Sequence, residues 1–226
     1  HNEPSVRSFA ELPRRKGVIR GALEGPVEIR SGGLRFSVDV LEGQKTGMYL
    51  DQRENHQRAA FYAHGRCLDV FSYQGGFGLH MAQGGAESVT LVDQGERALV
   101  AAEEAARRNG LQERVSCIHG NAFDLLKAHQ RGGESYDVIC LDPPAFAKNR
   151  RALEGAYRGY KEINLRAMMM LKPGGLLLSS SCSYHMGLAE FEGMLQEAAI
   201  DVGRRVQLLE RRIQALDHPE VLGFPA

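Results

Sequence analysis

The sequence predicts an α/β fold, in which a doubly wound, Rossmann-like parallel sheet follows a small region that contains a β-hairpin. From about Arg66 onward, short apolar runs alternate with longer helical patterns. This alternation is typical of a parallel sheet that is covered by helices on both faces. The first apolar run ends in a glycine-rich turn, which is where such sheets bind their ligands. Before Arg66, short alternating segments flank a pair of glycines instead.

The hairpin is predicted from two segments in which apolar and polar residues alternate. Val27–Arg30 and Leu34–Val40 are joined by a turn that contains Gly32 and Gly33, a pattern that favours a β-hairpin. An isolated hairpin is only marginally stable in water, so this one must pack against the rest of the chain. We therefore divide the sequence into a small β-rich linker and hairpin domain, residues 1–45, and a main domain, residues 46–226.

The main domain is expected to alternate strands and helices. The predicted strands are Cys67–Phe71, Ser88–Asp93, Val115–His119, Tyr136–Leu141, Leu176–Ser180 and Val206–Leu209. The predicted helices are Gly78–Gln83, Glu96–Asn109, Phe123–Gln130, Tyr157–Leu171 and Ala189–Val202. The segment Lys172–Gly175, which contains a proline and two glycines, is expected to end one helix and turn the chain into the next strand.

Composition and charge exclude some classes of protein. Lys and Arg together number 28, as do Asp and Glu, so the formal net charge is zero and gives no positive support for nucleic-acid binding. No apolar run approaches the length of a membrane span, and the polar start, residues 1–15, is unlike a signal peptide. We expect a cytoplasmic protein without a membrane partner. Because the chain does not begin with Met, we also expect it to be a fragment of a longer protein.

The four cysteines are far apart and form no C-x-x-C pair. This spacing disfavours both a disulfide framework and a zinc ribbon, and no metal site is expected. Cys67, Cys117 and Cys140 lie in apolar runs and are expected to be buried, reduced core residues.

The segment Leu68–Gly78 is the most informative part of the sequence. An apolar strand ends there in a turn that contains Gly75, Gly76 and Gly78, which would let the backbone approach a ligand closely. No register of these glycines fits the G-x-G-x-x-G spacing of dinucleotide-binding enzymes. The segment resembles instead the looser acidic strand and glycine turn of enzymes that use S-adenosylmethionine. A glycine-rich turn that binds no ligand is the alternative.

The next two predicted strands end in polar residues that could contact such a cofactor. Asp93 ends the second strand, where a carboxylate can accept from both ribose hydroxyls, or can cap the following helix. Asn121 follows the third strand, where methyltransferases usually place an Asp that accepts from the adenine amino group. Its amide oxygen could accept in the same way, or could serve as a helix cap.

The fourth predicted strand runs into Asp142, Pro143 and Pro144. The prolines stiffen the chain as it leaves the sheet, and are expected to fix Asp142 at the methyl end of the cofactor. Asp-Pro is also a common turn dipeptide. In enzymes that methylate exocyclic amines, an aromatic residue directly follows the second proline. Here Ala145 intervenes before Phe146, which disfavours amine methylation.

Cys182 lies just past the fifth predicted strand, where it should neighbour Asp142. A thiolate that adds to carbon 6 of a pyrimidine turns the ring into an enamine, whose carbon 5 can then take a methyl group. A base removes the proton from carbon 5 and the thiolate leaves. A lone cysteine is more often a small buried residue, but its position at the edge of the expected site favours the nucleophile.

Five segments carry a resemblance to a known family: Gln44–Arg53, Phe71–Phe77, Asp142–Phe146, Arg158–Asn164 and Ser181–Ser183. Together they resemble the bacterial and archaeal ribosomal RNA cytosine-5 methyltransferases of the RlmI type, and the resemblance covers nearly the whole chain. The fold that it implies is the Rossmann-like sheet of class I methyltransferases, and the cofactor is S-adenosylmethionine. Members of this family also carry a small N-terminal RNA-binding PUA domain, which we expect to lie upstream of the fragment.

The resemblance implies a product and a set of site residues. The product is 5-methylcytosine in 23S (large-subunit) ribosomal RNA, with Cys182 as the nucleophile and Asp142 binding the target base. The residues implied to cover the cofactor are Tyr49, Gln52 and Arg53, and those implied to line it are Phe71, Tyr73, Gly75, Gly76, Asp93, Asn121 and Asp142. Ribosomal RNA is the expected partner, and a homodimer is left open.

Contacts with RNA are predicted only from three basic runs, Arg14–Lys16, Lys148–Arg151 and Arg211–Arg212. They could hold phosphates, or could be solvated surface charges. The target base must be single-stranded or flipped out to be reached.

Two other functions stay open. A sister enzyme could methylate another atom of ribosomal RNA, such as guanine N7, and would need no thiol because ring nitrogens are already nucleophilic. A non-catalytic RNA-binding or assembly factor could keep the fold without binding S-adenosylmethionine, which calorimetry would reveal. A nicotinamide-dependent oxidoreductase is disfavoured by the missing dinucleotide spacing.

Overall fold

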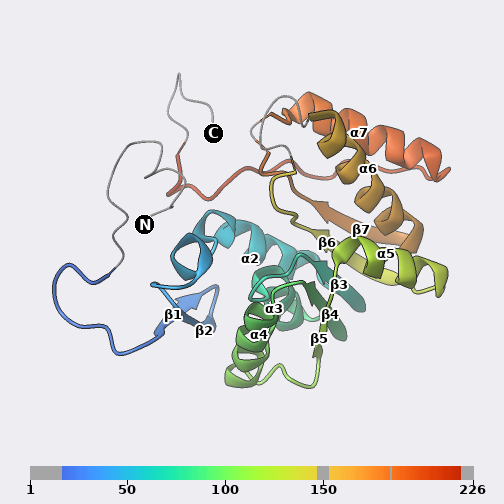
Figure 1. Ribbon diagram of the computed structural model, residues 1–226. Helices are drawn as coiled ribbons and strands as arrows, with labels where there is room; N and C mark the ends of the chain where they lie inside the picture. Colours follow the sequence, from blue (N-terminus) through green and yellow to red (C-terminus); the bar gives the residue numbers. More distant parts are fainter. Residues whose placement is uncertain (1–16, 147–152, 184, 220–226) are drawn as a thin grey trace.

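The computed structural model describes residues 17–146, 153–183 and 185–219 (Figure 1). Its centre is a five-stranded sheet in the order β5-β4-β3-β6-β7, in which all neighbouring strands are parallel. The strands are β3 (Arg66–Val70), β4 (Ser88–Asp93), β5 (Val115–His119), β6 (Tyr136–Leu141) and β7 (Leu171–Ser179). The predicted doubly wound α/β fold is therefore confirmed.

Helices cover both faces of the sheet. They are α3 (Gly76–Gly84), α4 (Glu96–Arg108), α5 (Ala122–Arg131), α6 (Leu153–Met170) and α7 (Leu188–Asp201). Alternate strand residues point to opposite faces: Cys67 and Leu91 belong to the core beneath α3 and α4, whereas Leu68 and Val92 pack with side chains of α5 and α6. Figure 1 shows α5, α6 and α7 on one side of the sheet and α2, α3 and α4 on the other.

The hairpin of β1 (Val27–Ser31) and β2 (Leu34–Val38) is antiparallel, as predicted. The apolar side chains of β2 are buried in the same core as those of α3 and α4. The side chain of Asn109, which follows α4, holds the backbone of Arg35 through two hydrogen bonds, of 2.8 and 2.9 Å. The hairpin thus packs against the main sheet's helices, as its marginal stability requires.

Between the hairpin and the sheet lie two short 3-10 helices, η1 (Gln44–Gly47) and η2 (Leu50–Gln52), and helix α2 (Arg53–Tyr62). Helix α2 was not predicted from the sequence. His56 and Ala59 are its only buried residues, so it has no apolar stripe of helical period from which it could be recognised.

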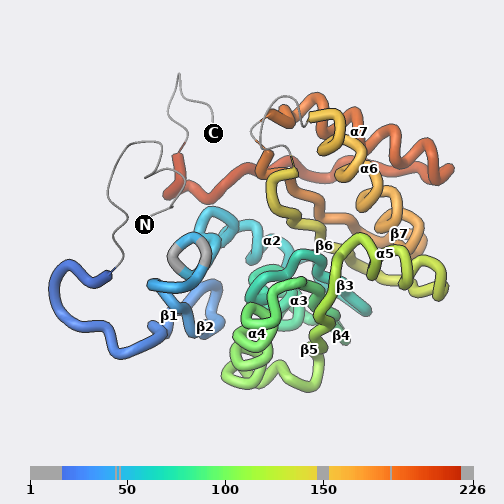
Figure 2. Tube along the Cα trace, viewed as in Figure 1, coloured from blue at the N-terminus to red at the C-terminus, as the bar shows by residue number. Residues whose placement is uncertain are grey.

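The strand predicted at Val206–Leu209 is wrong. Residues 204–213 have no regular secondary structure, and Val206 and Leu209 are 53% and 63% exposed. A strand pattern stabilises a strand only when one of its faces is buried, and here none is. Residues 203–219, which we call the C-terminal segment, run from α7 back towards α2 (Figure 2).

Two smaller predictions also need correction. Lys172–Gly175 does not precede the last strand but lies within β7, where it bulges between the pairs Tyr136–Leu171 and Val138–Leu176. Its proline is tolerated because β7 is an edge strand of the described sheet. Cys117 is half-buried rather than buried, because β5 forms the other edge. Cys67 and Cys140 are buried, as expected.

None of the helices that the structure describes is long and apolar enough to cross a membrane. Among the same residues, no three or more His, Cys, Asp or Glu side chains cluster in a way that could hold a metal ion.

Candidate active site

The candidate site lies at the carboxyl ends of β3 and β6, the neighbouring strands whose connections run to opposite sides of the sheet. Such a reversal leaves a crevice in which α/β proteins bind ligands. After β3, the turn from Phe71 to Gly75 is tied to β4 by two backbone donors. The amide of Ser72 donates to the carbonyl of Val92 (3.0 Å), and the amide of Tyr73 donates to the carboxylate of Asp93 (2.8 Å).

The backbone of this turn is strained. Phe71 and Tyr73 have φ angles of 65° and 49°, in the left-handed region that side chains other than glycine rarely adopt. Gly75 follows with a φ of 76°. Such strain persists only where the surroundings fix the backbone, and it is concentrated at ligand-binding sites.

Asp69, inside β3, fixes the helix that begins after the turn. Its side chain is buried, and its Oδ2 accepts from the amide of Gly78 at 2.7 Å. Burial raises the pKa of this carboxyl to about 8. A Cβ at Gly78 would collide with Leu91, so this glycine is needed for the close packing of α3 on the sheet.

His56 of α2 packs directly on the same turn. A Cβ at Gly76 would collide with the His56 ring, which also meets the ring of Phe77 edge-on, with centroids 4.5 Å apart. Burial and the nearby His80 lower the pKa of His56 to about 3, so the ring is neutral. Neither Asp69 nor His56 was predicted from the sequence as a site residue, because each contacts the turn or the start of α3 only through tertiary packing.

Asp93 joins the glycine turn to the loop that precedes α4. One carboxylate oxygen accepts from Tyr73 and the other from the amide of Gly95, at 2.7 Å. Each carboxylate oxygen has a second lone pair, so the side chain can still accept further donors.

Asn121 caps α5. Its side-chain oxygen accepts from the amides of Phe123 (2.9 Å) and Asp124 (3.4 Å), and the side chain is exposed. The oxygen that could accept from adenine is therefore engaged in the cap, the alternative role named from the sequence.

Asp142 follows β6 and is half-buried. Its Oδ1 accepts from the side-chain amide of Gln52 at 3.2 Å. Burial and the negative charge of Asp51 raise the pKa of Asp142 to about 6, against hydrogen bonds from Ser180 and Gln52 that lower it.

The thiol of Cys182 lies at the same edge of the sheet. The residue is exposed, and its Sγ lies 3.6 Å from the carbonyl oxygen of Pro143, the residue after Asp142. Partial burial and the charge of Asp142 raise the pKa of the thiol, while the charge of Lys45 lowers it.

Tyr49 completes this group from the segment before α2. Its ring meets the ring of Tyr73 edge-on, with centroids 5.4 Å apart. Burial and the neighbouring Tyr73, Cys182 and Asp142 raise its pKa to about 12. The structure thus brings Tyr49 and Gln52 from before α2 next to the turn after β3, the end of β6 and Cys182.

The chain matches a known protein family over most of its length. The sequence model of the S-adenosylmethionine-dependent methyltransferase family matches residues 19–223. The chain belongs to this family. The methyltransferase is 43% identical over 99% of its length to "Ribosomal RNA large subunit methyltransferase I" of Aeromonas salmonicida (strain A449), of which it covers 57%. It is 44% identical over 95% of its length to the protein of the same name in Shewanella amazonensis (strain ATCC BAA-1098 / SB2B), of which it covers 55%.

The methyltransferase therefore spans little more than half the length of these curated relatives. A crystal structure of a methyltransferase complexed with SAH matches with a TM-score of 0.72 and 25% sequence identity, over 80% of this chain and 48% of that chain. The fold and the cofactor class expected from the glycine turn are both confirmed.

The residues around the turn fit S-adenosylmethionine. The cofactor offers ribose hydroxyls and amino groups that suit carboxylate acceptors such as Asp93 and Asp142, and its positive sulfonium suits an acidic, aromatic surrounding. The hydroxyl oxygen of Ser72, in the same turn, is buried and has no hydrogen-bond partner among the described residues. Such an unsatisfied buried group calls for an explanation, and a ligand can supply one.

Two other predicted residues have partners within the protein. The guanidinium of Arg53 pairs with Asp217 of the C-terminal segment at 2.8 Å. The ring of Phe71 packs edge-on against Phe146, with centroids 6.2 Å apart, and Phe146 in turn packs on Tyr160 of α6. The aromatic residue after Ala145 thus belongs to a packed cluster.

The basic runs give limited support for RNA contacts. Arg14–Lys16 and Lys148–Arg151 lie outside the described residues. Arg211 pairs with Glu192 of α7, and Arg212 pairs with Glu210. The positive charges of this last run are therefore partly neutralised within the protein.

Proposed function

We propose that this methyltransferase forms 5-methylcytosine in large-subunit ribosomal RNA, through a transient covalent bond between Cys182 and the target base. The observation that carries the proposal is the exposed thiol of Cys182 beside the loop of Asp142, 3.6 Å from the carbonyl oxygen of Pro143. A thiol and a carboxyl group at one ligand-binding edge supply a nucleophile and a group that can hold the base. The name printed for the relatives, a large-subunit ribosomal RNA methyltransferase, supports the choice of substrate.

The bound cofactor supplies an electrophilic methyl group on a sulfonium, whose positive charge also favours a nearby thiolate. We propose that the turn of Tyr73, Gly75 and Gly76 holds the cofactor, with Asp93 accepting from its ribose. Tyr49 covers it from the segment before α2, together with Gln52 and Arg53. Phe71, Asn121 and Asp142 complete the proposed lining.

Asp142 is proposed to select the base. Its carboxylate accepts a hydrogen bond from the N4 amino group of cytosine, whereas uracil presents a carbonyl oxygen there and would be repelled. Because the pKa of Asp142 is about 6, the carboxylate form predominates at neutral pH.

Cys182 is proposed to carry the chemistry. Its thiolate adds to carbon 6, so that a carbon–sulfur bond forms and the electron pair of the C5–C6 double bond becomes nucleophilic at carbon 5. After carbon 5 has gained the methyl group, a base removes its proton, the double bond is restored and the carbon–sulfur bond breaks. Cys182 leaves as a thiolate, ready for another cycle. The pKa of the thiol is raised, and the positive charge of the bound sulfonium would favour its ionisation.

The experiment is nucleoside mass spectrometry of ribosomal RNA from cells with and without the gene. We expect loss of a single 5-methylcytosine from the large-subunit RNA, and its return when the gene is restored. Restoration by the Cys182→Ala form would exclude covalent catalysis. Loss of a methylguanine instead would establish the sister function that needs no thiol.

A further inference from the structure

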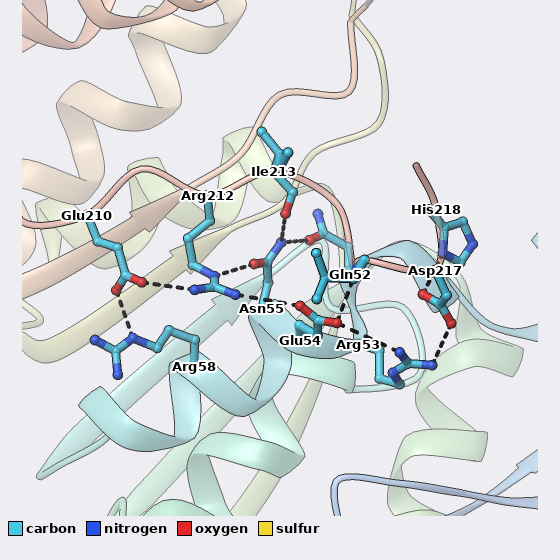
Figure 3. A network of polar contacts seen from close by, with 11 residues as sticks. Gln52, Arg53, Glu54, Asn55, Arg58, Glu210, Arg212, Ile213, Asp217 and His218 are labelled. Atoms are coloured by element: carbon cyan, nitrogen blue, oxygen red, sulfur yellow. Dashed lines mark hydrogen bonds and ion pairs between the residues drawn. The ribbon is translucent and has the colours of Figure 1, made fainter. Parts of the chain in front are cut away.

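A line of side-chain hydrogen bonds connects Asp142 to the C-terminal segment. Gln52 donates to Asp142 Oδ1 at 3.2 Å, and its own oxygen accepts from Asn55 at 2.6 Å. The oxygen of Asn55 accepts from Nε of Arg212 at 2.8 Å. Figure 3 shows the part that runs from Arg212 through Asn55 to Gln52. Residues 52 and 55 flank the start of α2, whereas Arg212 is 157 positions away from Asn55.

Two groups fix the direction of every bond in this line. The guanidinium of Arg212 can only donate, so it must face the oxygen of Asn55. The carbonyl of Ile213 can only accept, and it lies 3.1 Å from the Asn55 nitrogen. The Asn55 amide therefore has one orientation, with its nitrogen towards Gln52. The oxygen of Gln52 must therefore accept from the Asn55 nitrogen, which leaves the Gln52 nitrogen to donate to Asp142.

Arg212 is itself held from two sides. Its Nη1 pairs with Glu210 at 2.9 Å, and Glu210 also accepts from Nε of Arg58 at 2.7 Å. Its Nη2 lies 4.0 Å from Glu54. The hydrogen bonds from Arg58 and Arg212 lower the pKa of Glu210 to about 2, so this acid stays ionised.

We propose that Asn55 and Arg212 are positioning residues, which hold the Gln52 side chain so that its NH2 group, rather than its oxygen, faces the Asp142 carboxylate. The inference rests on the proposed function, in which that carboxylate binds the base. Without the line, Gln52 could turn its oxygen to Asp142, and two acceptors would face each other.

The groups around Asp142 show that its pKa depends on the hydrogen bond from Gln52. The groups whose charges or hydrogen bonds act on Asp142 are Tyr49, Asp51 and Gln52 from before α2, Asp69 of β3, Cys140 of β6, and Ser180 and Cys182 from beyond β7. Among the described residues, hydrogen bonds from Ser180 and Gln52 stabilise the ionised form. Removing the Gln52 donor should therefore raise the pKa of Asp142.

The sharpest variant is Asn55→Leu. Leucine has nearly the shape of asparagine and adds no charge that could itself act on Asp142. It cannot donate to Gln52, so the Gln52 amide is no longer held in one orientation. The matched control is Arg211→Gln, because Arg211 ties the neighbouring residue of the same segment to Glu192 and has no part in the line.

The readout is the titration of the Asp142 carboxyl by carbon-13 NMR, with the signal assigned through Asp142→Asn. We expect Asn55→Leu to raise this pKa by up to roughly one pH unit, the equivalent of losing one hydrogen bond to a charged group. Arg212→Met, which also removes a positive charge, should raise it too, Arg212→Lys should largely retain the native value, and Arg211→Gln should leave it unchanged. An unchanged pKa in Asn55→Leu, with the protein folded, would overturn the proposal.

The same proteins separate this inference from the proposed function. A raised pKa in Asn55→Leu with an equal shift in the pH profile of methylation supports both. A raised pKa with an unchanged pH profile supports the positioning role, but shows that Asp142 does not act as an ionised group in the reaction.

Discussion

The Sγ of Cys182 lies 3.6 Å from the carbonyl oxygen of Pro143, although the two residues are 39 positions apart in sequence. The contact arises because β6 and β7 are parallel neighbours that end at the same edge of the sheet. The stiff backbone of two successive prolines then places Asp142 and the thiol in one neighbourhood.

Replacement of Cys182 by Ser should abolish methyl transfer without affecting the cofactor. A hydroxyl is a far weaker nucleophile than a thiolate at neutral pH, so we expect a loss of at least about 100-fold in kcat. The side chain is exposed, and a serine hydroxyl can still donate to the carbonyl oxygen of Pro143. Calorimetry should therefore give an unchanged affinity for S-adenosylmethionine, and a variant that remains active would contradict covalent catalysis.

The adduct itself should be detectable. An RNA substrate in which the target cytosine carries fluorine at carbon 5 has no proton to lose there, so the carbon–sulfur bond cannot break after methyl transfer. We expect a protein–RNA species that survives denaturing electrophoresis with the native protein and is missing with Cys182→Ser. Formation of the same species by the serine variant would point to a different nucleophile.

The pH profile of kcat/KM should show the ionisation of Asp142. The carboxylate is the proposed active form, and its pKa is about 6. Activity should therefore fall as the pH is lowered through 6, by up to about tenfold for each further pH unit. The thiol has a raised pKa, so its ionisation should appear in the pH profile as a separate change in activity at higher pH. Activity that rises on acidification through pH 6 would show that a protonated Asp142 is required.

The stability of the fold should decrease between about pH 4 and 8 because of Asp69. Its pKa in the folded protein is about 8, above the ordinary value of 3.8. The folded state thus binds more protons than the unfolded state between these values, and the free energy of unfolding falls as the pH rises. Asp69→Asn can still accept from Gly78 but does not titrate. Urea denaturation should show that the variant gains stability relative to the native protein from pH 5 to pH 8. If the free energies of unfolding of the two proteins changed equally with pH, the raised pKa of Asp69 would be contradicted.

Substitution of Gly76 tests the packing of α2 on the cofactor turn. A Cβ there would collide with the His56 ring, so Gly76→Ala should cost about 1–3 kcal/mol of unfolding free energy and weaken cofactor binding. Gly193, in α7, is a matched control because nothing lies within 4 Å of a Cβ built there. Gly193→Ala should be neutral or stabilising by up to about 1 kcal/mol, since alanine is the better helix former. Equal effects of the two substitutions would argue against the His56 contact.

Where a segment buries one face, the sequence could be interpreted correctly. The β4, β5 and β6 strands were predicted with their bounds as observed. Turns frame their apolar runs, and the apolar residues of each run contribute to the cores on the two faces of the sheet. Helix α2 could not be found because it buries only His56 and Ala59. The strand predicted at Val206–Leu209 is wrong for the opposite reason, because the apolar residues there remain exposed. A local hydrophobic pattern therefore predicts an element correctly only where its apolar residues are buried in the folded protein.

The sequence by itself determined the parallel α/β fold, the glycine turn and the polar residues at the strand ends, because each of these depends on local backbone chemistry and on hydrophobic period. Only the tertiary structure decided which of those residues meet. It set the neutral His56 on Gly76, directed Arg53 to Asp217, and aligned Arg212, Asn55 and Gln52 with Asp142. Contacts between different elements, such as the pair of Arg53 and Asp217, which are 164 positions apart, depend on how helices and extended segments pack. No local pattern in a single sequence shows that packing.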